Sequence, residues 1–324
     1  MSDMIFFAHA FDGQGGSTPL TGEAIGKALH DEQLAWVHLD GNHPDTPAWL
    51  EAELAYLDSH ITGALLAQET RPRITRIGNG FLIILRGVNL NKNADPDDMV
   101  SVRLWIDPHR IISVRRRKVR ALQDIDERLR HGTGPKHSGD FITQLISRLS
   151  ERMRPVIDGL DDETDAVEEK MLTSETQTQL REEIVEIRMQ AIMFRRYMVP
   201  QRDVIQELEQ IDLDWLSPEN RRTLQEEWQH VSRYVEDLEA IRERAQIVKD
   251  ELASIIADRL NKNMYVLSVI AAIFLPLGFL TGLLGINVGG IPGAGDSRSF
   301  VIFCGILVAV VVAQVALFKK MKWF

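Results

Sequence analysis

Two long apolar segments stand near the C-terminal end of the chain. Met264 to Leu284 comprises 21 residues without a formal charge, and Phe300 to Phe318 comprises 19 more. A helix of about 20 apolar residues crosses the hydrocarbon core of a bilayer. The second segment has no polar face to turn toward water, which argues against two core helices of a soluble protein. We therefore predict a hairpin of two transmembrane helices, 264–284 and 300–318, joined by an outer loop at 285–299.

The charges around this hairpin predict its orientation. The outer loop carries only Asp296 and Arg298, whereas basic residues flank the other ends of the two spans. These are Arg259, Lys262, Lys319, Lys320 and Lys322, the last three in a basic tail at 319–324. Such positive charge is typical of the cytoplasmic side. We expect a multi-pass protein of a bacterial inner membrane, in contact with its lipids and with both termini in the cytoplasm.

Residues 1–135 alternate strand-like and helix-like pieces. Short runs rich in branched and aromatic residues predict strands: MIFFAHAF, LAWVHLDG, GFLIILRGVNL, VSVRLWI and RIISVRRR. PAWLEAELAYL and the stretch around ITGALLAQE suit short helices, and GNG at Gly78–Gly80 indicates a hairpin turn. We predict a cytoplasmic α/β domain over 1–135, with an internal boundary at the loop 131–140.

From Phe141 onward, apolar residues recur at three- and four-residue spacing almost as far as the membrane, which predicts long helices over 141–263. Pro200 and the stretch LSPEN interrupt this pattern. In LSPEN, Ser217 is a suitable N-cap with Pro218 at the first helical position. A helix from Pro218 to Leu284 would have 67 residues and form a stalk that continues into the first span. Pro276 should loosen or kink that span.

Acidic residues are concentrated in the long helices. The formal charge of the whole chain is −10, and residues 151–260 contain 27 acidic and 15 basic side chains. Nucleic acid is not an expected partner, because phosphate backbones bind basic surfaces. The acidity fits either a solvated wall or a surface that concentrates cations near a pore. The single cysteine, Cys304, lies in the second span, where a functional thiolate is not expected.

Small and weakly polar residues form a stripe along the first span. Steps of three and four residues from Asn261 meet Met264, Ser268, Ala271, Leu275, Gly278, Gly282 and Gly285. Small residues let helices approach closely, and Gly278 and Gly282 have the GxxxG spacing. The stripe fits a packing face or the lining of a conduit. One hairpin encloses no lumen, so a conduit requires several copies around an axis, and otherwise the hairpin anchors a cytoplasmic scaffold or enzyme.

Strong metal ligands are absent from the spans. Neither span contains Asp, Glu, Lys, Arg or His, and no Cys/His cluster has zinc-ligand spacing, so a dehydrated tetrahedral site is not encoded. The amide of Asn287, at the outer end of the first span, suits transient contact with a hydrated cation. The sequence contains no phosphate loop, nucleophile elbow or metalloprotease helix. We therefore expect no enzyme, no catalytic residue and no resident cofactor.

The segment Asn261 to Asn287 resembles the pore helix of the CorA superfamily of divalent-cation transporters, which ends in a Gly-Met-Asn signature. Here the signature reads Gly285, Ile286, Asn287. The isoleucine and the following VGGIPG resemble the ZntB zinc-transporter branch. LAQETRPR and LRGVNLN extend the resemblance over essentially the whole chain.

The resemblance implies a homopentameric funnel in which five first spans line a pore and five second spans surround them. Gly285, Ile286 and Asn287 would form the pore entrance, and the stripe from Asn261 to Gly282 would line the pore. Gly278 lacks the hydroxyl that many relatives carry at this position. Asp296 and Arg298 would nearly cancel in five copies, so either electrostatic capture of cations at the mouth is weak or Arg298 points away from it.

The resemblance also implies a cargo and a direction. It implies zinc uptake with proton linkage, a symport. A potential of 100 mV drives a divalent cation inward by about 4.6 kcal/mol, which agrees with uptake. The spans offer no Asp, Glu or His for a proton relay, so proton linkage depends on the resemblance alone. The alternatives are a magnesium, cobalt or nickel channel of the same fold, zinc efflux, and a membrane-anchored scaffold.

Overall fold

The structure is a computed structural model that describes residues 4–31, 33–55, 59–68, 70–173, 177–285, 291, 293 and 295–320. The chain forms two compact units, Met1–Lys249 and Asp250–Phe324. The first unit contains all the strands of the described chain and six complete helices, and the second contains one complete helix. One further helix contributes its first part to the first unit and its last part to the second.

Seven strands form one mixed sheet in the first unit. They are β1 (Ile5–Phe11), β2 (Ser17–Pro19), β3 (Ala35–Asp40), β4 (Arg73–Ile77), β5 (Gly80–Gly87), β6 (Val100–Ile106) and β7 (Arg110–Arg115), in the order β2-β1-β3-β7-β6-β5-β4. Only β3 and β7 pair in parallel. The five predicted strands are confirmed, whereas the sequence analysis missed β2 and β4. The predicted hairpin turn is also confirmed, since Ile77 pairs with Gly80 and Gly78 has a φ of 60°.

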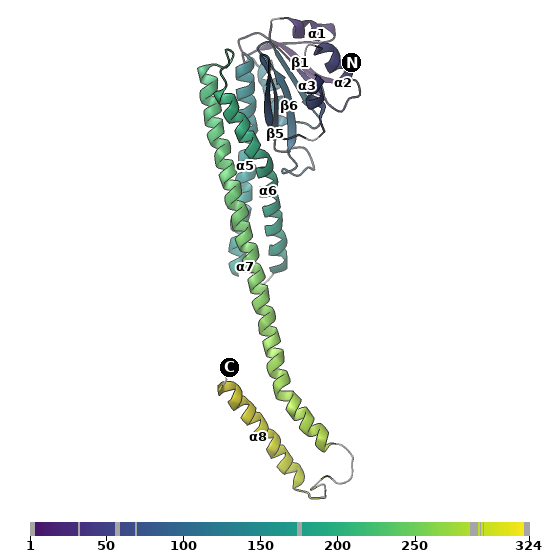
Figure 1. Cartoon of the computed structure of the whole chain (residues 1–324), viewed down its shortest axis with the longest axis vertical. Coiled ribbons are helices and arrows are strands. Elements are labelled where there is room, and N and C mark those ends of the chain that lie inside the picture. The colour runs from purple at the N-terminus through teal and green to yellow at the C-terminus, as the bar shows by residue number, and fades with distance from the viewer. Residues whose placement is uncertain are drawn as a thin grey trace. The chain divides into compact units, whose positions relative to one another are not determined.

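Helices cover both faces of this sheet (Figure 1). One layer comprises α1 (Glu23–His30), α2 (Thr46–Glu53) and α3 (Ser59–Leu66); the other comprises α4 (Arg120–Arg130), α5 (Ser138–Thr173) and α6 (Gln177–Gln210). The side chains of β3 alternate between the layers, as successive strand residues do. Val37 packs in the core under α1 to α3, whereas the Trp36 ring contacts the Phe141 ring of α5 at 4.8 Å between centroids. The α/β class is confirmed, and α1 and α4 add to the predicted helices.

The predicted loop 131–140 is shorter in the structure. α5 begins at Ser138, whose hydroxyl donates to the Asp107 carbonyl at 2.7 Å and anchors the first turn. α5 contacts β5, and α6 contacts β4 and β5. Because the long helices pack on the sheet, residues on both sides of this loop belong to one compact unit, and the division between units falls after Lys249.

The two predicted helix interruptions have different outcomes. Pro200 lies inside α6, so the expected interruption there is wrong. The next residue, Gln201, is buried and accepts a hydrogen bond from the Arg86 backbone N–H of β5 at 2.7 Å, so tertiary contact holds the helix across the proline. The interruption at LSPEN is confirmed. Ser217 caps α7 (Pro218–Leu284), because its hydroxyl accepts from the Asn220 N–H at 3.1 Å, and the Asn220 side chain accepts from the Ser217 N–H.

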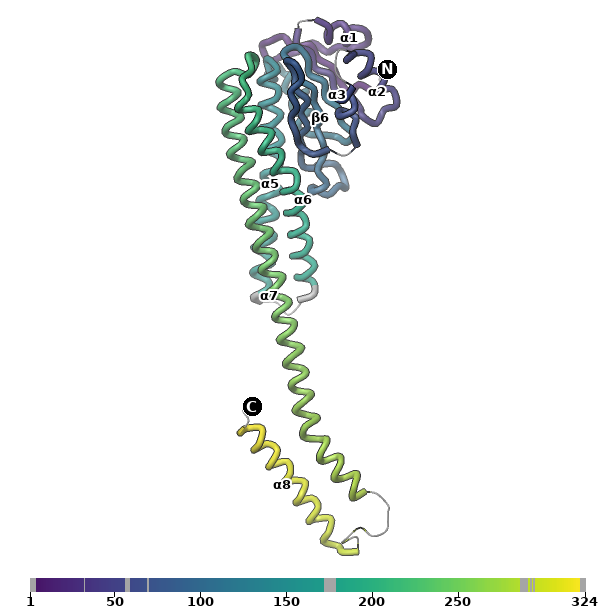
Figure 2. The backbone as a smooth tube through the Cα atoms, viewed as in Figure 1, coloured from purple at the N-terminus to yellow at the C-terminus, as the bar shows by residue number. Residues whose placement is uncertain are grey.

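The helix α7 has the predicted 67 residues and continues through Pro276 (Figure 2). Within the first unit it packs beside α5 and α6: the Tyr234 hydroxyl reaches the Ser150 carbonyl at 3.5 Å, and Arg195 forms an ion pair with Glu239. The second unit consists of the last part of α7 and α8 (Ser299–Lys320). The predicted hairpin at 264–284 and 300–318 is therefore a pair of helices.

Candidate ion pathway

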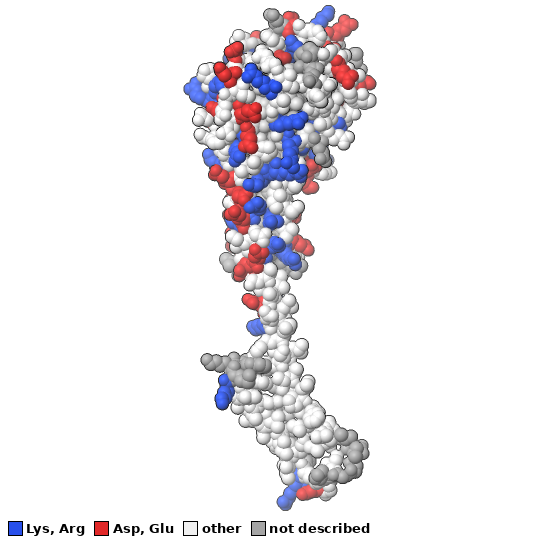
Figure 3. Space-filling view, in the orientation of Figure 1, with Lys and Arg blue, Asp and Glu red and all other residues white. Residues whose placement is uncertain are grey.

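The last part of α7 and all of α8 are long and apolar enough to cross a membrane. In their most apolar windows only 6% and 0% of residues are buried within the chain. The part of Figure 3 that shows these segments has almost no charged side chains, in contrast to the first unit. A surface of this size and polarity requires lipid or further protein around it.

One side of α7 is covered by α8. The residues of the first span that lose exposure are Val269, Ala272, Ile273, Leu277 and Leu280. On α8 the corresponding side comprises Phe303, Cys304, Leu307, Val310, Val311, Gln314 and Phe318. Both sets recur at three- and four-residue spacing, so each helix uses one face for the contact. The two spans of one chain thus form a packed pair.

The predicted stripe lies on the opposite side of α7. Asn261, Met264, Ser268, Ala271, Leu275, Gly278, Gly282 and Gly285 are all exposed. At about 100° per residue, the stripe and the face covered by α8 point in directions roughly 150° apart. The structure therefore places the predicted residues on one continuous face that no part of the described chain covers. One chain alone does not enclose them.

The outer end of the stripe requires a glycine. α7 ends at Leu284, and the Gly285 N–H donates to the Thr281 carbonyl at 2.9 Å. A Cβ at position 285 would lie 2.9 Å from that carbonyl oxygen, closer than real Cβ contacts. A Cβ at Gly278 or Gly282, by contrast, would meet no heavy atom of the described chain within 4 Å beyond its own helical turns. Ile286 and Asn287, the other residues of the predicted entrance, lie outside the described residues.

The charges of the outer loop have local roles. The Asp296 carboxylate accepts from the Arg298 backbone N–H at 2.9 Å in a local turn just before α8. The Ser299 hydroxyl donates to the Gly293 carbonyl at 2.7 Å. Asp296 and Arg298 are both exposed. The turn contact gives Asp296 a structural reason to be present.

Two polar side chains in the spans were missed by the sequence analysis. Gln314 faces α7 and donates from Nε2 to the Ala272 carbonyl at 3.2 Å. Thr281 is exposed beside the stripe, and its hydroxyl donates to the Leu277 carbonyl at 2.9 Å. The sequence analysis gave the second span no polar face, and it overlooked the amide of Gln314. A lone amide within an apolar span was the signal that could have identified it.

The acidic helices of the first unit contain internal counter-charges. Arg244 of α7 pairs with Asp161, Asp165 and Glu168 of α5, with distances of 2.8 Å to both Asp161 and Glu168. The hydrogen bonds that Arg244 donates to Glu168 and Asp165 raise the pKa of its guanidinium. Figure 3 shows positive and negative side chains mixed over this unit. Among the described residues, no group of three or more His, Cys, Asp or Glu side chains is arranged to hold a metal ion.

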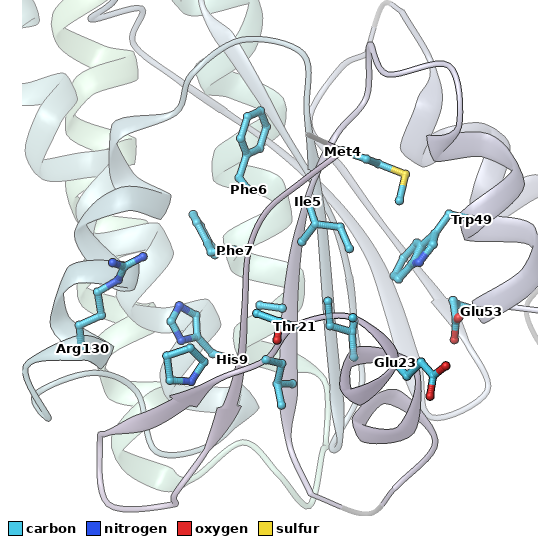
Figure 4. Close-up of a pocket in the computed structure, with 16 residues that line it drawn as sticks. Met4, Ile5, Phe6, Phe7, His9, Thr21, Glu23, Trp49, Glu53 and Arg130 are labelled. Carbon is cyan, nitrogen blue, oxygen red and sulfur yellow. The ribbon is translucent and has the colours of Figure 1, made fainter. Parts of the chain in front are cut away.

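A pocket lies in the first unit, beside β1, α1 and α2. Its volume is about 720 Å³, and Figure 4 shows Trp49, Glu23 and Glu53 toward one end and His9 and Arg130 toward the other. His9 Nε2 lies 2.6 Å from Asp126 of α4, and His9 Nδ1 lies 3.0 Å from the Ser17 hydroxyl of β2. These contacts join β1, β2 and α4. The lining is mainly apolar, so this pocket does not serve as an ion pathway.

Comparison with known proteins identifies the class. A family model described as CorA-like Mg2+ transporter protein matches residues 31–320. The chain therefore belongs to the CorA-like family of metal-ion transporters. Among its relatives, the zinc transport protein ZntB of Yersinia enterocolitica is 38% identical, covering 100% of this chain and 97% of that protein. The divalent cation transporter CmaX of Pseudomonas aeruginosa is 36% identical, covering 98% of this chain and 96% of that protein.

Solved structures confirm the fold. The full-length CmaX structure superimposes with a TM-score of 0.84 at 36% identity, covering 99% of this chain and 98% of the other. The CorA magnesium transporter of Methanocaldococcus jannaschii gives a TM-score of 0.78 at 18% identity and supports the fold alone. Family membership and the two apolar helices make this chain an inner-membrane protein with both termini in the cytoplasm, as the flanking charges predict.

Proposed function

We propose that the chain transports zinc through a passage lined by α7 of five identical copies. The observation that carries this proposal is the position of the stripe, which is exposed along the side of α7 opposite α8. Because α8 already covers the other side, only further copies can complete a lumen around the stripe. The second spans then form the outer, lipid-facing ring.

Zinc is the cargo that the full-length relatives support, since several of them are named zinc transport proteins. Asn287 would meet the hydrated cation at the entrance formed with Gly285 and Ile286. The membrane potential drives uptake. Met264–Leu284 and Phe300–Phe318 are fully described and contain no Asp, Glu, Lys, Arg or His. A proton that moves with zinc would therefore travel by water or by titratable groups of the cytoplasmic funnel, outside the two spans.

Cation flux into proteoliposomes tests this proposal. Zinc, magnesium and nickel are supplied in turn, each with and without a pH gradient, and the internal metal is followed with an indicator. We expect zinc to enter, and a dependence on the gradient if protons are linked. Entry of magnesium or nickel without zinc would establish the channel alternative, and zinc movement only outward would establish efflux.

Asparagine variants separate a passage from an anchor. Asn287→Ala should lower zinc flux by about tenfold or more, the range of an interaction worth at least 1.4 kcal/mol, while the oligomer still forms. The control is Asn263→Ala, because Asn263 is an exposed amide of α7 that lies about 100° from the centre of the stripe. Full flux with Asn287→Ala would contradict the proposed role of the entrance.

A further inference from the structure

Pro276 lies within the first span and lacks a backbone N–H. In a regular α-helix, that N–H would donate to the carbonyl four residues earlier, which is the Ala272 carbonyl. An unpaired carbonyl is costly in hydrocarbon, and prolines in transmembrane helices are tolerated where a neighbouring group satisfies the freed carbonyl. The Ala272 carbonyl therefore lacks its regular helical donor, and a donor on a neighbouring helix can take its place.

Gln314 of α8 supplies this donor. Its Nε2 lies 3.2 Å from the Ala272 carbonyl oxygen. The orientation of the amide follows from chemistry, because a carbonyl oxygen only accepts and the NH₂ group is the only donor of the amide. Figure 1 shows α8 beside the last part of α7 in the second unit, where this contact lies.

The environment of Gln314 argues against an incidental contact. Its Oε1 is buried and has no hydrogen-bond partner among the described residues. A leucine at this position would avoid that buried acceptor and would suit the aliphatic neighbours Leu307 and Val311 on the same face. The donation to Ala272 is the described contact that offsets this disadvantage.

We propose that Gln314 is a positioning residue for transport: it donates to the carbonyl that Pro276 leaves free and thereby fixes the outer half of the first span, Leu277–Leu284, against α8. This inference rests on the proposed function, because the orientation of that half matters for flux only if α7 lines the passage. Gly278 and Gly282 of the stripe belong to this half. Gln314 itself lies on the face away from the stripe and does not touch the ion.

The test is a double-mutant cycle. Gln314→Leu removes the donor, Pro276→Ala restores the N–H for Ala272, and the double variant combines both. In the parent background, Gln314→Leu should lower the maximal zinc flux by about fivefold, the effect of an interhelical hydrogen bond of ordinary strength. The zinc concentration at half-maximal flux should not change. In the Pro276→Ala background, Gln314→Leu should lower the maximal zinc flux by less than about twofold, because the alanine N–H already donates to the Ala272 carbonyl.

A matched control and a second measurement complete the design. Leu307→Ala removes volume from the same face of α8 without removing a hydrogen bond, so its effect should be equal in both backgrounds. The coupling between Pro276 and Gln314 is also measured from the unfolding temperature of the detergent-solubilised protein. That measurement does not require the Pro276→Ala variant to transport.

The outcomes are distinguishable. Equal losses from Gln314→Leu in the two backgrounds, in flux and in unfolding temperature, would overturn the assigned contact. Normal flux with Gln314→Leu would overturn the positioning role while leaving the proposed function intact. If the unaltered protein moved no zinc, the proposed function and the inference that depends on it would both fail.

Discussion

Substitution of Gly278 by alanine tests which face of α7 meets the neighbouring copies. Within one chain, a Cβ at Gly278 would meet no heavy atom of the described residues within 4 Å beyond its own helical turns, and the same is true of Gly305 in α8. A glycine-to-alanine change in a helix interior is favourable by about 1 kcal/mol when nothing opposes it. The single chain therefore predicts that both substitutions are tolerated or mildly stabilising.

The proposed assembly of five copies predicts a difference between the two substitutions. Gly278 lies on the stripe, whereas Gly305 lies on the part of α8 that is exposed away from α7. An added Cβ extends about 1.5 Å from Cα, so five copies would narrow a passage by roughly 2–3 Å in diameter. Where Gly278 instead packs on a neighbouring α7, the methyl groups prevent the close approach that small residues allow. Both cases obstruct transport.

The assay compares zinc flux into proteoliposomes for the parent, Gly278→Ala and Gly305→Ala proteins at equal protein density. We expect Gly278→Ala to reduce flux by about tenfold or more, equivalent to at least 1.4 kcal/mol in the barrier, and Gly305→Ala to stay within about twofold of the parent. Size-exclusion chromatography checks the oligomer. Equal flux for the two variants would refute the assignment of the stripe to the interior of the assembly.

Two further predictions concern the first unit and use tryptophan fluorescence to follow its unfolding. Burial, reinforced by Arg115, lowers the pKa of His38 from 6.5 to about 3, so the unfolded chain binds a proton below pH 6.5 that the folded chain does not. The free energy of unfolding should fall by about 2 kcal/mol between pH 8 and pH 5, and His38→Gln should flatten this pH dependence. An unchanged pH dependence in the variant would contradict the role of His38. Arg244→Met should lower the free energy of unfolding by about 1 kcal/mol, since solvent screens its ion pairs, and by less at high salt. Arg154 is more exposed, so Arg154→Met should not change the free energy of unfolding measurably.

The sequence predicts elements whose pattern is strong and local. The run GFLIILRG forms β5, buried along its whole length, and Ser217 with Pro218 marks the start of α7. β2 has only three residues, one of them proline, and presents no alternation that sequence reasoning could detect. At Pro200 the local signal is strong but misleading, because the contact of Gln201 with β5 keeps α6 continuous against the low helix propensity of proline.

The stripe of the candidate pathway was also predictable from a strong local pattern, but its tertiary contacts were not. Helical periodicity alone places Met264 and Leu275 on one face, and the structure leaves both exposed, at 65% and 74%. The partner of each span cannot be deduced from periodicity, because the register between α7 and α8 is a tertiary property. This is why the contact between Gln314 and Ala272 emerges only from the structure.

The chemistry of the stripe limits how the passage can choose among cations. Zinc prefers thiolate and imidazole ligands, and no Cys or His lies on the stripe between Asn261 and Gly285. Magnesium dehydrates reluctantly and keeps its waters. If the stripe lines the passage, its amide, hydroxyl and apolar groups meet both ions in their hydrated form, where the ions differ little in charge and size. On the proposed function, any strong preference for zinc must then arise from groups outside this face of the first span.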